Sequence, residues 1–239
     1  MRFSAKAVIM VALLVCMVPA ANAALAPYSQ DFEGLSQSSP TALGDNGWLV
    51  FANVFGPDWG YWYGYGVYPA PNGTGAFSNV AVGEGGAAQG NQQMVVFSDY
   101  NNANHADGAH IEALVFQERV IDAAAVGQTW VFDFDAKRGD LAGVTTAVAF
   151  IKTLNPAAGY ATTNFINLAT TAIPTSWSSY SLSLVIDASL VGQLLQFGFG
   201  STATLYQPSG VVYDNVEFHE MGVVGVEEST WGGVKSMFR

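Results

Sequence analysis

The stretch Thr129–Lys137, "TWVFDFDAK", carries the pattern that decides the fold of this chain. Its large apolar residues occupy every second position, and the positions between them hold Val131, Asp133 and Asp135. Side chains that alternate with a period of two point to opposite faces of an extended chain. The stretch therefore predicts a β-strand with one buried face, formed by Trp130, Phe132 and Phe134.

The same alternation recurs along the chain, between clusters of Gly, Asn, Pro and Ser. It is present in the ranges 48–55, 93–100, 111–120, 146–154, 179–187, 194–200 and 211–220. No segment shows a long apolar period of 3.6 residues bounded by helix caps. Many short strands in about 195 residues predict one all-β domain, an antiparallel β-sandwich, rather than two domains.

The first 23 residues have the features of a secretory signal peptide. Arg2 and Lys6 precede an apolar run from Ala7 to Val18, and the small-residue sequence Ala21–Ala23 follows. The run is short for a membrane span, so export with cleavage before Ala24 is favoured over an N-terminal anchor. We therefore expect a secreted protein, extracellular or on the cell surface, that is not inserted in the membrane after cleavage.

Cleavage would leave a chain without cysteine and with a strongly negative charge. Cys16 is the single cysteine, so no disulfide, thiol nucleophile or Cys-based zinc site is expected from Ala24 onward. Without Arg2 and Lys6, six basic residues remain beside nineteen acidic ones, a net charge of −13. Such a chain is expected to repel nucleic acid and anionic lipid.

Carboxylates near both ends of the domain form a candidate metal site. In "VVYDNVEF", Asp214 shares parity with the apolar residues Val212, Val216 and Phe218, where a charge needs compensation. Asp31 and Glu33 flank Phe32 near the start of the domain, and first and last strands of a sandwich are often neighbours. The three carboxylates are expected to meet around a calcium ion, which takes several oxygen ligands. The alternative is a turn-capping Asp and a Glu at a strand edge.

The segment from Pro57 to Gly73, "PDWGYWYGYGVYPAPNG", concentrates aromatic rings that have polar edges. Read as a strand, it places Trp59, Tyr61, Tyr63 and Tyr65 on one face, and Trp62 and Tyr68 on the other. Rings of this kind can stack on sugar faces while their edges bind hydroxyls. Two alternatives remain open at this point: the segment is a core strand with large buried side chains, or it forms a contact between subunits.

Several of these stretches resemble one family. The opening "DFEG" and closing "VVYDNVEF", with "TWVFDFDAK", "SWSSYSLSLVI" and "LLQFGFG" between them, are similar to jelly-roll carbohydrate-binding modules of families 4 and 9 and their galactose-binding-domain-like relatives in secreted bacterial proteins. The resemblance covers most of Tyr28 to His219. It implies a jelly-roll domain over residues 24–219 and a structural calcium between Glu33 and Asp214. Residues 220–239 differ in composition and are expected to be a tail, either a short docking or sorting element or a frayed end.

Catalytic patterns are weak. Asp133 and Asp135 have the i, i+2 spacing that a retaining glycosidase needs, but no Glu-x-Asp-x-x-Glu strand, nucleophile elbow or HExxH sequence is present. His105, Asp107 and His110 could bind a transition metal, yet they lie in a stretch typical of a surface loop. We therefore expect a non-catalytic protein that binds a polysaccharide or other glycan through the aromatic segment. The alternative is a structural or adhesive surface protein that self-associates through that segment.

Overall fold

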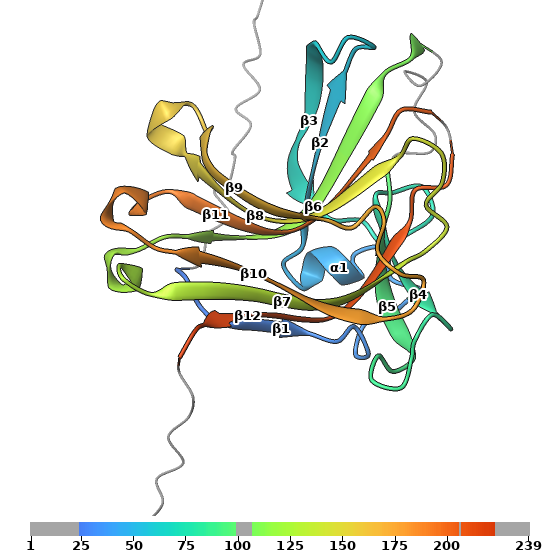
Figure 1. The fold of residues 1–239 in the computed structure, drawn as a ribbon, viewed down its shortest axis with the longest axis horizontal. Coiled ribbons are helices and arrows are strands. Elements are labelled where there is room, and N and C mark those ends of the chain that lie inside the picture. The colour runs from blue at the N-terminus through green and yellow to red at the C-terminus, as the bar shows by residue number, and fades with distance from the viewer. Residues whose placement is uncertain (1–23, 99–106, 206, 223–239) are drawn as a thin grey trace, which may run out of the picture.

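A computed structural model describes residues 24–98, 107–205 and 207–222, which form a two-sheet antiparallel β-sandwich (Figure 1). The predicted fold class is confirmed. The expected signal peptide, and the expected tail beyond residue 222, lie outside the described residues. Within the ranges just given, no helix is long and apolar enough to cross a membrane.

The first sheet contains six strands. Its spatial order is β10 (Ser178–Val185), β7 (Thr129–Arg138), β12 (Val211–Glu220), β5 (Gln92–Val96) and β4 (Ser78–Val82). The short opening strand β1 (Tyr28–Gln30) pairs with the end of β12, so the first and last strands are neighbours as expected.

The second sheet also contains six strands. Its spatial order is β3 (Tyr61–Pro69), β2 (Leu49–Phe55), β6 (His110–Val120), β11 (Leu194–Ala203), β8 (Thr146–Asn155) and β9 (Ala161–Ala169). Single helical turns are present at α1 (Ala42–Asp45), η2 (Ala123–Ala125), η3 (Pro156–Ala158) and η4 (Ala188–Leu190).

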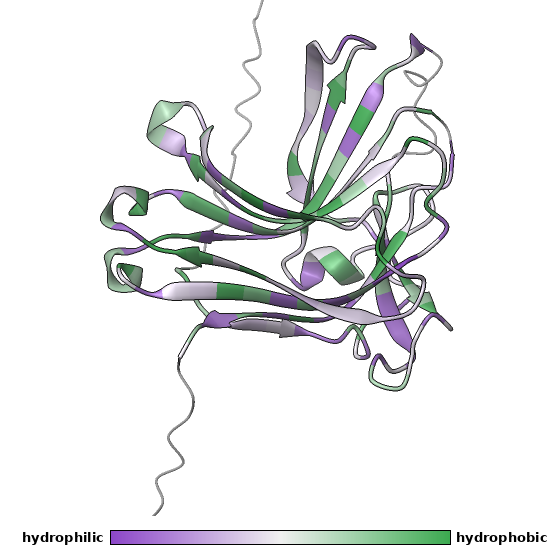
Figure 2. Ribbon diagram, in the orientation of Figure 1, coloured by the Kyte–Doolittle hydropathy of each residue, from purple (hydrophilic) through white to green (hydrophobic). Residues whose placement is uncertain are grey.

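The core between the sheets is rich in stacked aromatic rings. Phe199 of β11 stacks on Tyr213 of β12 with ring centroids 3.7 Å apart, and Phe197 stacks on Phe218 at 4.1 Å. These two pairs join the second sheet to the first. Trp48 and Phe132 are also fully buried beside them. Hydrophobic and hydrophilic residues alternate along the strands that supply this core (Figure 2).

One hairpin departs from the compact sandwich. Strands β2 and β3, with the beginning of β6, rise away from the rest of the second sheet (Figure 1). The turn of this hairpin carries Trp59, so the aromatic segment lies on a projecting part of the molecule. The predicted strand from Trp48 is β2, which pairs with β3, and the predicted strand from Ile111 is β6, which pairs with β2.

Candidate functional site

The aromatic segment forms the outer strand of the hairpin and the turn before it. Trp59, Tyr61, Trp62 and Tyr63 are all exposed, with Trp59 at 58%. Tyr65 and Tyr68 are partly buried and pack against the main core. The predicted ligand residues therefore divide into four exposed rings and two rings that support the strand.

Two β-bulges prevent these rings from forming the single strip that alternation predicted. The register of β2 with β3 shifts between Val50 and Ala52 and again between Val54 and Phe55. Tyr63 and Tyr65 are thereby opposite Val54 and Ala52, on the core side of the strand. Tyr61 is opposite Phe55, on the outer side. The expectation of one face was wrong because each bulge inserts a residue and reverses the alternation.

The turn holds Trp59 in an unusual conformation over an aromatic base. Its φ is +64°, a region that side chains other than Gly, Asn and Asp rarely adopt. The Asp58 carboxylate accepts a hydrogen bond from the Gly60 amide at 3.0 Å and fixes the turn. The indole stacks on the His110 imidazole with centroids 3.9 Å apart and planes 10° from parallel. One indole face is covered by His110, and the ring remains largely exposed.

His110 was expected to lie in a surface loop, and that expectation was wrong for this residue. It begins β6 and pairs with Phe55 of β2. Asp107 is described and exposed, whereas His105 lies outside the described residues. Phe55 contacts Trp59 and Tyr61 at 5.9 and 5.8 Å between centroids. Residues from β2, β3 and β6 thus build one aromatic cluster at the hairpin tip, made of Phe55, Trp59, Tyr61 and His110.

This cluster continues onto the outer face of the second sheet, the face turned away from the first sheet. Paired residues of neighbouring strands point to the same side. Four cross-strand rows of paired residues follow one another along β6 on this face. The two rows nearer the hairpin are Glu112 with Asn53 and Thr202, and Leu114 with Phe51, Gly200 and Val148. The two rows further away are Phe116 with Gly198 and Phe150, and Glu118 with Gln196, Lys152 and Phe165. The sequence reasoning did not assign a site here.

Two glycines, Gly198 and Gly200, leave room for large side chains on this outer face. A Cβ on Gly198 would overlap the Val115 carbonyl oxygen and lie 2.8 Å from the Phe116 Cβ. Phe116 and Phe150 are fully buried there and, with Leu114, form a second apolar cluster separate from the main core. Glycine inside a strand marks such close approach. In the sequence, the alternation of Gly and Phe in "LLQFGFG" was the pattern that could have predicted this close packing.

Polar groups surround this apolar cluster. Asn53 Nδ2 donates to Glu112 Oε2 at 2.6 Å, and Gln196 Nε2 donates to Glu118 Oε2 at 2.7 Å. The Gln196 Oε1 atom is buried and has no hydrogen-bond partner among the described residues. Burial lowers the pKa of Lys152, and the charges of Glu112 and Glu118 oppose this only in part. The apolar cluster is therefore covered, and the charged groups on this face are Glu112, Glu118 and Lys152.

The structure brings the predicted metal carboxylates into one region but ties each of them differently. Asp31 Oδ1 accepts from the Glu33 amide at 3.2 Å, as a turn cap does. Glu33 Oε1 accepts from the amides of Asn91 and Gln92 at 2.7 and 2.8 Å. In the described part of the chain, no group of three His, Cys, Asp or Glu side chains has an arrangement that holds a metal ion.

Asp214 lies on a different face from the one its parity predicted. A register shift between Asp214 and Glu217, with Asn215 at φ +45°, reverses the alternation. Tyr213, Val216 and Phe218 face the core, and the Asp214 side chain points to the opposite side of β12. It is nevertheless only 1% exposed. Burial, reinforced by the charges of Glu33, Asp135 and Asp31, raises its pKa to about 7.

A second buried oxygen lies beside this carboxylate. Asp214 Oδ2 and Gln93 Oε1 are both buried without a hydrogen-bond partner in the described residues. The register of β12 with β5 pairs Tyr213 with Met94, so one further step places Gln93 beside Asp214 on the same face. Two buried oxygens without partners at one place are oxygens of the kind that a hard cation takes, but they are only two of the several ligands that calcium needs.

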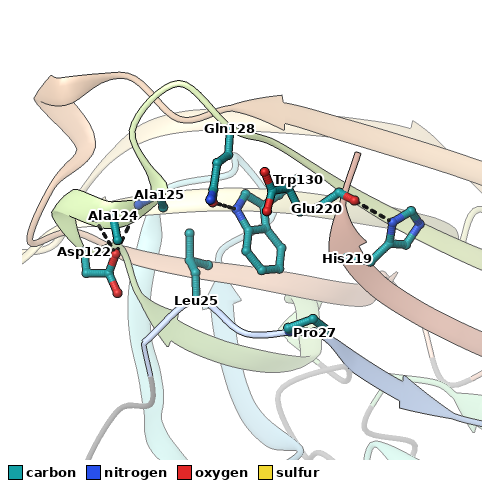
Figure 3. Close-up of a pocket in the computed structure, with 9 residues that line it drawn as sticks. All are labelled: Leu25, Pro27, Asp122, Ala124, Ala125, Gln128, Trp130, His219 and Glu220. Carbon is teal, nitrogen blue, oxygen red and sulfur yellow. Dashed lines mark hydrogen bonds between the residues drawn. The ribbon is translucent and has the colours of Figure 1, made fainter. Parts of the chain in front are cut away.

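A separate hollow of about 540 Å³ lies where the described chain begins (Figure 3). Leu25, Trp130 and His219 line it, and Trp130 Nε1 donates to Gln128 Oε1 at 2.9 Å. His219 Nε2 lies 2.9 Å from Asp133 Oδ2. This hydrogen bond raises the pKa of His219. None of the predicted ligand or metal residues lines this hollow.

Comparisons by sequence give no relative: no family model matches the chain, and no curated protein matches it. Solved structures are similar in fold. The Stig cyclase Fisc from Fischerella sp. TAU has 13% identity and a TM-score of 0.47, over 81% of this chain and 97% of that one. The C-terminal family 22 carbohydrate-binding module of Clostridium thermocellum Xyn10B has 16% identity and a TM-score of 0.39, over 82% and 94%.

The enzymatically active domain of bacteriophage CBA120 tailspike protein 4 is a third similar structure, with 12% identity and a TM-score of 0.45. The match covers 78% of this chain but about a fifth of that chain, 21%. These neighbours include binding modules and enzymes, so their fold does not decide between the two. What they show is a β-sandwich that resembles carbohydrate-binding modules and Stig cyclases.

Proposed function

We propose that this chain is an exported, non-catalytic glycan-binding β-sandwich. Its primary contact is the exposed pair Trp59 and Tyr61 on the outer side of the hairpin, with the exposed rings of Trp62 and Tyr63 beside it. The observation that carries the proposal is the stack of Trp59 on His110 at the projecting turn. A glycan is the ligand class because ring faces stack on sugar rings while indole and phenol edges bind hydroxyls.

The conformation of Trp59 supports a functional role for its ring. A non-Gly residue at positive φ costs on the order of 1 kcal/mol, and such strain gathers at ligand sites. Glycine would relieve the strain, and burial does not explain the ring, because most of it is exposed. His110 and Phe55 hold the indole in place, which lowers the entropy lost on binding.

The outer face of the second sheet would extend this site along a polymer. From His110 to Glu118, β6 spans roughly 26 Å at about 3.3 Å per residue, enough for an oligosaccharide. Glu112 and Glu118 would accept hydroxyl hydrogens, and Lys152 would donate to a ring or glycosidic oxygen. Phe165, half exposed on β9, would close the far end.

Calcium is part of the proposal as a structural ion. Asp214 and Gln93 would supply oxygen ligands that the fold otherwise leaves without partners, and Glu33 lies in the same charged region. The ion would neutralise the buried carboxylate and hold the segment around Gln92 against the opening strand. It would serve the fold rather than contact the glycan.

The partners of the two closest-spaced aspartates support a non-catalytic role. Asp133 is hydrogen-bonded to His219. Asp135 accepts hydrogen bonds from Ser179, Asn215 and Gln89. Burial tends to raise the pKa of Asp135, but these bonds outweigh it and lower the pKa. A general acid needs a raised pKa. This pair would therefore not act as a glycosidase acid and nucleophile.

The experiment that tests the proposal is a titration of the chain from Ala24 with a panel of soluble glycans of two to six sugar units. Tryptophan fluorescence reports binding, and the variant Trp59→Ala/Trp62→Ala is titrated in parallel. We expect saturable binding that strengthens with glycan length and is lost in the variant. If no glycan of the panel changes the fluorescence, and the mass of the protein in solution increases with its concentration in a way that depends on these rings, the self-associating surface protein would be favoured.

A further inference from the structure

Charged side chains are distributed unusually among the strands. In the described strands, Asp, Glu, Lys and Arg occur only in β6, β7, β8 and β12. All four of these strands lie inside their sheets. The edge strands β3, β4, β9 and β10 contain no charged residue. Proteins that stay monomeric commonly place charges, prolines or bulges on edge strands, because an unpaired edge invites another strand.

Three of the four edge strands have other protection. β3 contains two register shifts and ends at Pro69, and the pairing of β9 shifts opposite Thr153 and Leu154. β4 has only five residues. β10 differs from all three. Its eight residues, Ser178–Val185, pair with β7 in one unbroken register and include no Gly or Pro.

We propose that β10 pairs antiparallel with β10 of a second copy of this chain and joins the two first sheets into one. The strand is self-complementary. Ser179, Ser181 and Ser183 are exposed on the outer face, while Leu182 and Leu184 are buried on the core face. In the face-preserving register whose two-fold axis passes through Ser181, Ser179 lies opposite Ser183 and Tyr180 lies opposite Leu182.

Charge favours a second copy at this edge over other parts of the surface. The exported chain would carry a net charge of −13, so two copies repel wherever their acidic surfaces meet. At β10 the approaching strands carry no charge. The nearest strand carboxylates, Asp133 and Asp135, lie one strand back on β7 and are hydrogen-bonded to His219 and Ser179. Figure 1 shows β10 beside β7, on the side of β7 away from β12.

A cysteine experiment tests the contact directly. The chain from Ala24 contains no cysteine, so Ser181→Cys introduces a single thiol. Opposed Cβ atoms in an antiparallel pair lie about 4.5–5.5 Å apart, within reach of a disulfide. We expect mild oxidation to give a covalent dimer of Ser181→Cys. The matched variant Thr162→Cys, an exposed position on the edge strand β9, should stay monomeric.

Sedimentation velocity over a range of concentrations supplies the second test. The parent should be in monomer–dimer equilibrium, and Ser181→Lys/Ser183→Lys should raise its dissociation constant at least about tenfold, since like charges would face each other. Both serines are exposed, so the variant should keep the parent melting temperature. Trp59→Ala/Trp62→Ala should dimerise as the parent does. A monomeric parent at all concentrations, or a lysine variant that dimerises unchanged, would overturn the proposal.

Discussion

Trp59 stacks on His110 with ring centroids 3.9 Å apart and planes 10° from parallel. This contact joins the hairpin turn to the first residue of β6, fifty-one positions later in the chain. It fixes the indole on a platform while most of the ring stays accessible. The proposed glycan site depends on this relationship, because a freely rotating side chain would lose more entropy on binding.

His110 is thus expected to act as a positioning residue. His110→Ala removes the base of the stack and should weaken glycan binding about two- to tenfold, the range expected for one aromatic pair. His110→Phe keeps a flat ring under the indole and should restore most of the affinity. Isothermal titration calorimetry of both variants checks this. Equal affinity for parent and His110→Ala would show that the stack does not prepare the site.

Calcium should stabilise the parent through Asp214. An ion present at about one hundred times its dissociation constant adds roughly 2.7 kcal/mol to the free energy of unfolding. Asp214→Asn should lose the calcium-dependent rise in melting temperature while keeping its stability in chelator, because the neutral amide avoids the cost of a buried charge. Differential scanning calorimetry with calcium and with chelator measures both.

Asp187→Asn is the control for the calcium experiment. Asp187 caps the short η4 turn through the Ser189 amide, far in sequence from the proposed ion ligands. This variant should lower the melting temperature equally with and without calcium. A parent that melts at the same temperature in both conditions would remove calcium from the account.

The pair of His219 and Asp133 should make stability depend on pH. The hydrogen bond that His219 donates to Asp133 raises the pKa of His219 above its usual value of 6.5. The stabilisation is therefore complete below about pH 6.5 and is lost as the pH rises through the folded-state pKa. Both side chains are more than a third exposed, so the effect should stay under about 1 kcal/mol.

Urea denaturation at pH 5.5 and pH 8.5 tests this pair. Asp133→Asn should destabilise the protein more at the lower pH, and His219→Gln should remove the difference. A loss of stability that is the same at both values would mean that the ion pair contributes nothing.

The close packing on the outer face of the second sheet should make Gly198 intolerant of a side chain. Gly198→Ala would place a methyl group against the Val115 carbonyl and the Phe116 backbone. We expect a loss of about 1–3 kcal/mol or more. Gly66, also in a strand, has nothing within 4 Å of an added Cβ, so Gly66→Ala should change stability little. Similar stability for the two variants, measured by urea denaturation, would contradict the described packing.

The fold was predictable because period-two alternation is a local property of each strand. The predicted strands at Thr129, Thr146 and Val211 correspond to β7, β8 and β12. β9 was missed because its exposed positions are Ala, Thr and Asn together with the apolar Phe165, which gives a weak alternation. β4 was missed because it is only five residues long.

The site was less predictable because bulges and register are set by contacts between distant segments. Alternation alone placed Tyr61 and Tyr63 on one face and Asp214 with Val216, and a bulge reversed each assignment. The outer-face groups Glu118, Gln196 and Lys152 come from three strands, and only their pairing brings them together. The Trp and Tyr content of the aromatic segment allowed the proposal that it is exposed. The sequence could not distinguish an exposed segment from a core strand.

The central claim is that the Trp59 ring binds glycan, and Tyr160 provides a matched control for it. Both residues sit in turns at positive φ, +64° and +62°, and both are about equally exposed, at 58% and 60%. The direct measurement is calorimetric titration of Trp59→Ala and Tyr160→Ala with the glycan that the parent binds best. We predict about a tenfold loss of affinity for Trp59→Ala and less than about a twofold change for Tyr160→Ala, as a ring-stacking contact of about 1.5 kcal/mol would give. Equal affinities for the two variants, or a parent that binds no glycan, would contradict the account.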